Sequence, residues 1–136
     1  MQLTPYLIFD GDCREAFEFY HRCLGGEIVA MIDHSAPEMA AHTPPGWGNK
    51  IMHARLIAGG AVLMGSDNMP GQSGKKEGFS VSLQVDTPEE AERFFTALSD
   101  GATITMPLGP TFWAVSFGML TDRFGVAWMV NCEQAP

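Results

Sequence analysis

Residues 79–101 read FSVSLQVDTPEEAERFFTALSDG, in which a strand pattern passes directly into a helix pattern. Apolar and polar residues alternate from 79 to 86, which is typical of a β-strand with one buried face. Thr87 and Pro88 then fit the first positions of a helix, because Thr accepts a hydrogen bond from the helix amides and Pro lacks an amide that would be unpaired there. Apolar residues recur at helical spacing as far as Leu98, and Gly101 ends the predicted helix.

The amino-terminal segment repeats this order. Residues 3–26 read LTPYLIFDGDCREAFEFYHRCLGG and predict a strand over 3–9 followed by a helix that ends at the glycine pair. Asp12 and Glu15 have the spacing of a capping box at the start of this helix. Asp10 corresponds to Asp86 and Gly25 to Gly101, each 76 positions later. A constant offset across strand, helix and helix end indicates an internal duplication.

Three strand patterns follow each predicted helix. They cover 27–32, 51–57 and 61–66 in the first half, and 102–106, 113–120 and 126–132 in the second. The fold class is therefore α+β: two tandem βαβββ modules, 1–67 and 79–132, joined by a connector at 68–78. One module alone could not cover both faces of its sheet, so we expect a single domain over 1–136. In it, the modules form a cupped mixed sheet with helices on the outer face and a cavity between them.

Composition excludes several classes of protein. The chain has 136 residues, 46% hydrophobic and 18% charged, as expected of a globular protein. Its net charge of -8 and its scattered basic residues argue against binding to nucleic acid, where Lys and Arg must replace counterions. No apolar run approaches the roughly 20 residues that span a bilayer, and residues 1–10 lack the pattern of a secretory signal. Its three cysteines show no disulfide framework, so we expect reduced thiols and a cytoplasmic location.

The two-module pattern resembles the PhnB-like branch of the vicinal-oxygen-chelate superfamily, which includes glyoxalase I, extradiol dioxygenases and fosfomycin-resistance proteins. The resemblance rests on short motifs along nearly the whole chain: residues 5–13 (PYLIFDGDC), Ala16, Phe19-Tyr20, 24–26 (LGG), 52–54 (MHA), Ser66-Asp67, 111–113 (TFW), 121–125 (TDRFG) and Trp128. It implies a glyoxalase-like fold and a homodimer. It leaves the reaction open, because members of that branch mostly lack an established activity.

Metal-dependent members of the superfamily hold a divalent ion with side chains from the first and last strand of each module. Carried over to this sequence, those positions are Pro5, Met64, Ser80 and Met129. Divalent ions prefer imidazole and carboxylate groups, and no His, Asp or Glu lies within two residues of any of these positions. We therefore expect no metal and no other cofactor at the usual site.

The segment 33–48 offers a second place for a metal. His34, Glu38 and His42 are four residues apart, which would place them on one face of an α-helix. The prolines of the segment argue against a regular helix, so a solvated loop is the alternative. Because long irregular loops beside a cavity are often functional, the same segment is the candidate lid.

The third predicted strand supplies the candidate catalytic residues. His53 and Arg55 alternate with apolar residues, so their side chains are expected to face the cavity or solvent. His53 could move a proton or bind an anion, or it could be a structural histidine. Asp67, at the end of the next strand, could orient His53 or bind a ligand, or it could be a turn residue.

The remaining candidates are ligand-binding residues. Trp113 and Phe117 share one strand face and would form an apolar stacking wall, unless they are core residues. Ser80, Ser82 and Gln84 give the fifth predicted strand a polar face, and Met64 and Met129 would make the floor of the cup apolar and adaptable.

Three functions remain open. The leading hypothesis is a metal-independent protein that binds a small, partly apolar molecule between the modules, either to sequester it or to transform it with His53 as acid–base. The second is a metal-dependent lyase or dioxygenase with relocated ligands. The third is a dimeric interaction or regulatory module whose pocket is vestigial.

Overall fold

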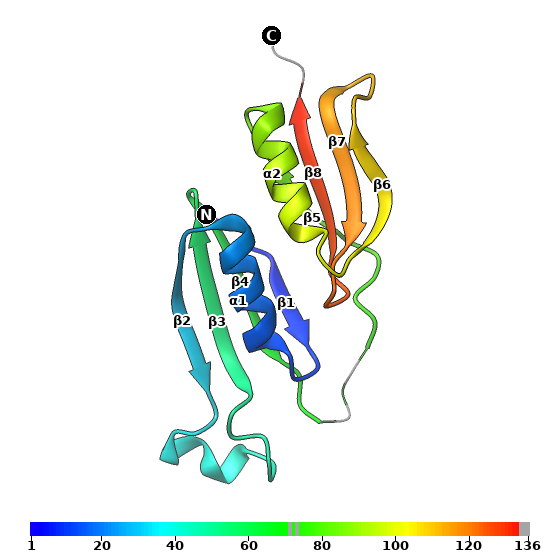
Figure 1. The fold of residues 1–136 in the computed structure, drawn as a ribbon. Coiled ribbons are helices and arrows are strands. Elements are labelled where there is room, and N and C mark those ends of the chain that lie inside the picture. Colours follow the sequence, from blue (N-terminus) through cyan, green and yellow to red (C-terminus); the bar gives the residue numbers. More distant parts are fainter. Residues whose placement is uncertain (71, 73, 134–136) are drawn as a thin grey trace. The chain divides into compact units, whose positions relative to one another are not determined.

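The computed structural model describes residues 1–70, 72 and 74–133. The chain divides into two compact units, Met1–Gly74 and Lys75–Pro136 (Figure 1). That both form a single domain with a connector at 68–78 stays a prediction, and residues 71 and 73 of that connector lie outside the described residues. Among the described residues, no helix has the length and apolar character that a membrane span requires.

The first unit has the predicted order of one strand, one helix and three strands. Its elements are β1 Tyr6–Phe9, α1 Cys13–Leu24, β2 Glu27–Asp33, the 3-10 helix η1 Pro37–His42, β3 Ile51–Ala58 and β4 Ala61–Asp67. The strands form one sheet in the order β1-β4-β3-β2. β1 runs parallel to β4, and the other neighbours are antiparallel.

The second unit repeats this topology. Its elements are β5 Val81–Gln84, α2 Pro88–Leu98, β6 Thr103–Gly109, β7 Ala114–Thr121 and β8 Ala127–Glu133. The sheet order is β5-β8-β7-β6, with β5 parallel to β8 and the other neighbours antiparallel. Each strand therefore has a counterpart in the first unit, which confirms the predicted pair of βαβββ modules.

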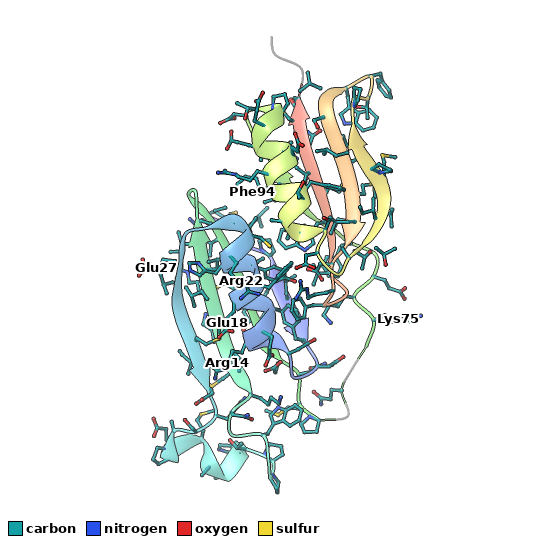
Figure 2. The ribbon with its side chains drawn as sticks, in the orientation of Figure 1. Arg14, Glu18, Arg22, Glu27, Lys75 and Phe94 are labelled. Carbon is teal, nitrogen blue, oxygen red and sulfur yellow. The ribbon has the colours of Figure 1, made fainter. Side chains whose placement is uncertain are left out.

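In each unit the helix packs against one face of its own sheet (Figure 1). Under α1, the buried side chains of the strands alternate with more exposed ones, as Leu7 and Phe9 do in β1. The helix contributes fully buried Phe17 and Tyr20 to this core. Arg14, Glu18 and Arg22 are spaced one turn apart along α1, and the last two are exposed (Figure 2). Burial of one helical stripe and exposure of the other explain why the apolar spacing predicted this helix well.

The core of the second unit lies beneath α2. Buried Ala91, Phe95 and Leu98 of the helix face the strands, where Trp128 and Val130 of β8 are also buried. Trp128 has its indole Nε1 2.8 Å from Asp122 Oδ2, to which it donates. Trp128 is therefore a core residue, on the opposite side of β8 from Met129.

The first strand of each unit is shorter than the sequence predicted. β1 begins at Tyr6 rather than residue 3, and β5 covers 81–84 rather than 79–86. Both are edge strands with a single partner, and their pairing is limited to Met64–Asp67 of β4 and Trp128–Asn131 of β8. β6, in contrast, extends three residues past its predicted end, to Gly109.

The two helices differ in how their first turns are capped. Thr87 caps α2 as predicted, since its hydroxyl accepts from the backbone amide of Glu90 at 3.1 Å. The capping box predicted for Asp12 is wrong, because the Asp12 side chain makes no capping hydrogen bond. Thr87 has the extended backbone of a cap residue, with φ -132° and ψ 151°, whereas Asp12 has φ -111° and ψ 21°. The first amide of α1, that of Cys13, instead donates to the distant Asp67 Oδ1 at 3.0 Å.

Candidate functional site

Each sheet has one face that its own helix leaves uncovered, here called the helix-free face. Strand alternation assigns residues to it, because neighbours of buried residues point the other way. In the first unit, six residues of β1, β3 and β4 lie on this face: Tyr6, Ile8, His53, Arg55, Met64 and Ser66. The structure thus places the predicted His53, Arg55 and Met64 on one surface.

A tyrosine–histidine pair occupies this face. The Tyr6 hydroxyl lies 3.1 Å from His53 Nδ1, and the two rings stack with their centroids 5.8 Å apart and 25° between their planes. The hydroxyl donates to Nδ1 when that nitrogen is unprotonated and accepts from it when it is protonated. Tyr6 is the register partner of Met64, so its ring reaches diagonally across β4 to His53 on β3. The pair therefore fixes the orientation of the His53 ring while both residues stay accessible.

Arg55 lies beside this pair without a counter-charge of its own. Met64 is its register partner as well as that of Tyr6, so Met64 separates the two residues. The Arg55 Nε is buried and has no hydrogen-bond partner. The ion pairs found among the described residues join Arg14 to Asp33 and Arg123 to Asp100, and neither includes Arg55.

Asp67 lies on the other face of the sheet. It is the register partner of buried Phe9, and its carboxylate accepts three backbone amides: Gly11 at 2.9 Å, Cys13 at 3.0 Å and Ile51 at 2.7 Å. The structure therefore does not bring Asp67 to His53. Its contacts tie the start of α1 and the start of β3 to the end of β4, which supports a structural role, and a catalytic role has no contact behind it.

The helix-free face of the second unit is polar in a different way. The Asn131 amide donates to Gln84 Oε1 at 2.8 Å, and the Gln84 amide donates to Ser82 Oγ at 2.8 Å. Ser82 is the register partner of Met129, so both predicted residues lie together on this face. Ser80 precedes β5 and is half-buried.

Asn131 was missed as a candidate. It is buried, and its Oδ1 has no hydrogen-bond partner although its amide nitrogen starts the chain of hydrogen bonds to Gln84 and Ser82. The signal was available in the sequence, because Asn131 has the same strand parity as Met129. A polar residue beside Met129 shows that this surface is not purely apolar, as the two methionines alone suggested.

Two of the predicted ligand-binding residues, Trp113 and Phe117, are in contact on this unit. Trp113 is 43% exposed, and its ring meets that of Phe117 at 5.2 Å and 68°. Phe112, which precedes Trp113, contacts it edge-on at 4.8 Å and is 94% exposed. The exposure of Trp113 argues against the alternative that it is a core residue.

The residues that replace the superfamily's metal ligands do not fit a divalent metal. On the helix-free faces, Tyr6 stands beside Met64 and Ser82 stands beside Met129. The first-strand position beside Met64 is thus Tyr6, because Pro5 precedes β1 on the opposite parity. Phenol, hydroxyl and thioether groups are poor ligands for divalent ions that select imidazole and carboxylate.

The second metal hypothesis concerned the loop after β2. Pro37–His42 forms a 3-10 helix, in which residues three apart, not four, share a face. His34, Glu38 and His42 are therefore not aligned as the α-helical spacing required. Within the described parts of the chain, no group of three or more His, Cys, Asp or Glu side chains is arranged to hold a metal ion. Absence of a cofactor stays a prediction.

The thiols are not placed for nucleophilic chemistry. Cys13, Cys23 and Cys132 form no disulfide and are buried, in agreement with the expected reduced state. Burial and, secondly, the negative charge of Asp67 raise the pKa of the Cys13 thiol far above its usual range. A thiol that stays protonated is a weak nucleophile, so Cys13 is a packing residue.

Comparisons with known proteins agree with this architecture. Protein YjdN of Escherichia coli is 38% identical over 96% of this chain and 95% of its own length. The crystal structure of protein PA1353 from Pseudomonas aeruginosa has a TM-score of 0.89 at 56% identity, and covers 99% of both chains. A structure from Bacillus cereus described as a putative 3-demethylubiquinone-9 3-methyltransferase, PhnB protein, has a TM-score of 0.80 at 27% identity over 97% of this chain and 99% of its own.

The PhnB-like resemblance read from the sequence is confirmed by these relatives, and the glyoxalase-like fold by the topology of both units. The family model described as "Glyoxalase/Bleomycin resistance protein/Dioxygenase superfamily" matches residues 2–130. The chain belongs to this superfamily.

Proposed function

We propose that this protein binds a small, partly apolar molecule against the helix-free face of its first sheet, without a divalent metal, and that His53 contacts the polar group of the ligand. The observation that carries the proposal is the hydrogen bond between the Tyr6 hydroxyl and His53 Nδ1 at 3.1 Å. It holds the one histidine of the strands in a defined orientation on an accessible surface.

The surroundings of the pair suit an apolar ligand body. Ile8 and Ile32, on the strands at the two edges of the same sheet, are 43% and 46% exposed. The second unit separately carries an aromatic surface of its own, formed by Trp113 and Phe117. Clusters of exposed apolar side chains on a small protein commonly mark binding surfaces, since their contact with water is unfavourable. These surfaces favour a ligand over a vestigial site.

The chemistry open to His53 follows from its hydrogen bond. With Nδ1 engaged by Tyr6, the Nε2 atom remains to donate a proton to a ligand or to take one from it. A binding protein would use this nitrogen as a hydrogen-bonding group, and an enzyme would use it as acid–base. Both uses require the same orientation, so the Tyr6 hydroxyl is a positioning group in either case.

The test is a thermal-shift screen of small aromatic and aliphatic metabolites, followed by calorimetric titration of every compound that raises the Tm. His53→Phe should weaken binding about tenfold, and Tyr6→Phe about threefold, as expected for the loss of one hydrogen bond. His21→Gln, on the exposed side of α1, is the matched control and should leave Kd unchanged. A chelator should also leave Kd unchanged.

Two results would contradict the proposal. The first is a screen in which no compound raises the Tm of the unmodified protein. The second is a ligand whose Kd the chelator abolishes and His53→Phe does not change. That second result would favour the metal-dependent alternative.

We also propose that the protein is a cytoplasmic homodimer. Superfamily membership supports the dimer, and three buried cysteines that form no disulfide are consistent with a reducing compartment. Sedimentation equilibrium at micromolar concentration should give twice the chain mass. A single species of the chain mass would overturn the dimer.

A further inference from the structure

We infer that the ligand carries an oxyanion, most simply a carboxylate on an apolar body, and that Arg55 binds it. The inference rests on the proposed function and names its ligand class. The first step is the position of Arg55 on β3. It shares the helix-free face with Tyr6 and His53, and its register partner is Met64.

The second step is the state of the guanidinium. The Arg55 Nε is buried and has no hydrogen-bond partner. A guanidinium stays charged at all ordinary pH values, and a buried donor without a partner is unfavourable, the more so when it carries charge. The chain has 16 acidic and 8 basic residues, yet the ion pairs of the described residues do not include Arg55. A cation left unpaired in an acidic protein indicates a partner that comes from outside the chain.

The third step is the duplicated fold, which acts as an internal control. In the first unit Arg55 pairs with Met64, and in the second unit Met119 pairs with Met129 at the equivalent position. The same sheet therefore forms with a methionine where Arg55 stands. Folding does not require a cation there, so its presence in one unit points to a role in binding.

The fourth step is the chemistry of the neighbours. Arginine presents its donors in a planar fork that matches the two oxygens of a carboxylate. His53 lies two residues away on the same strand face and offers a further hydrogen-bonding group. Met64 and Ile8 provide an apolar surface for the rest of the molecule. The set fits a small organic acid better than a neutral amide or an amine.

The experiment uses three pairs of probes that differ only in charge: benzoate and benzamide, phenylacetate and phenylacetamide, and cinnamate and cinnamamide. Titrations are made on the unmodified protein, on Arg55→Met, which copies the second unit, and on the control Arg93→Met in α2. Arg93 lies over the Phe94 ring at 4.7 Å, away from the strands. We expect the acids to bind the unmodified protein at least tenfold more tightly than their amides. Arg55→Met should remove that preference, and Arg93→Met should keep it.

A second measurement does not depend on the choice of probe. Without ligand, Arg55→Met should raise the Tm by a few degrees, because it replaces a side chain whose buried Nε donor is unsatisfied by an apolar side chain of similar length. Arg93→Met should change the Tm by less than about one degree. A fall of several degrees in Arg55→Met would show a structural partner and overturn the inference.

The outcomes separate this inference from the proposed function. Equal binding of acids and amides, lost in His53→Phe but kept in Arg55→Met, would sustain a binding function and reject the oxyanion. Failure of all six probes, together with no gain of Tm in Arg55→Met, would also reject the oxyanion. The proposed function would still be judged by its own screen.

Discussion

On equivalent positions of the two units, the first sheet carries Tyr6, His53 and Arg55, whereas the second carries Ser82, Phe117 and Met119. The equivalence follows from the strand register, in which Tyr6 and Arg55 pair with Met64 while Ser82 and Met119 pair with Met129. One duplicated topology thus accepts ionisable groups in one copy and neutral groups in the other. The helix-free faces are free to vary because folding depends on the helix-covered faces.

The helix-covered sides use buried aspartates differently. Asp67 accepts amides that are 56, 54 and 16 residues away in sequence. Asp122 accepts from groups two, four and six residues away: the amides of Phe124 and Val126 and the indole of Trp128. The first aspartate joins separate elements, and the second shapes one turn. Stability should therefore depend more strongly on Asp67.

The largest effect is expected for Asp67→Ala. Removing the carboxylate leaves three backbone donors, two of them buried, at the starts of α1 and β3 without an acceptor, which should cost about 3–5 kcal/mol of the free energy of unfolding. Asp122→Ala should cost about 2–3 kcal/mol, because the short turn can rearrange to expose its amides to water. Urea unfolding followed by circular dichroism measures both. Asp10→Ala, at an exposed position, is the control.

This comparison breaks if Asp122→Ala is the more damaging change, or if Asp67→Ala costs less than about 1 kcal/mol. Asp67→Asn refines it, because the amide keeps one acceptor oxygen for the amides of Gly11 and Cys13 but places an NH₂ group against that of Ile51. We expect the free energy of unfolding of Asp67→Asn to lie between that of the unmodified protein and that of Asp67→Ala.

The limits of sequence-based prediction follow the same division between local and distant contacts. Strand alternation, helical spacing and the cap at Thr87 are local patterns, and they predicted both modules and the face on which His53 lies. The cap at Asp12 failed because Asp67, 54 residues from Cys13, supplies the acceptor instead. The partner of His53 lies 47 residues away, so the sequence suggested the histidine but not Tyr6. Spacing along the chain carries no information on which distant side chains meet.

The second-largest loss of stability is expected when the glycines beneath the helices are replaced. A Cβ on Gly65 would lie 2.7 Å from the Leu7 carbonyl oxygen and 2.8 Å from Phe17 Cε1, and one on Gly118 would lie 2.7 Å from Phe95 Cε2. The Leu7 oxygen belongs to the backbone of β1 and cannot move without displacing that strand. Gly65→Ala should therefore cost about 2–3 kcal/mol, near the upper end for overpacking, and lower the Tm accordingly.

Gly118→Ala should cost less, about 1–2 kcal/mol, because the nearest atom belongs to a side chain that can tilt and the nearest backbone atom, Leu108 Cα, is farther away at 3.0 Å. The register makes Ala54 the counterpart of Gly118, since Ala54 pairs with Gly65 and Gly118 with Val130. One unit thus already tolerates alanine at that place. Gly109→Ala, where nothing lies within 4 Å of the new Cβ, is the control in thermal denaturation. If Gly65→Ala and Gly118→Ala lowered the Tm equally, the backbone of β1 would move as easily as the Phe95 ring.

The smallest change in stability is expected for substitutions of the residues that precede the two helices. Thr87→Ala removes the hydroxyl that accepts from the Glu90 amide and should cost about 1 kcal/mol, the usual value for an N-cap. Asp12→Ala should cost almost nothing or stabilise slightly, because its side chain makes no capping bond and its Oδ1 is buried without a partner. Denaturant midpoints at constant m-value measure both. If Asp12→Ala costs as much as Thr87→Ala, the Asp12 carboxylate stabilises α1 through the charge at its first turn, and Asp67 does not replace the local cap.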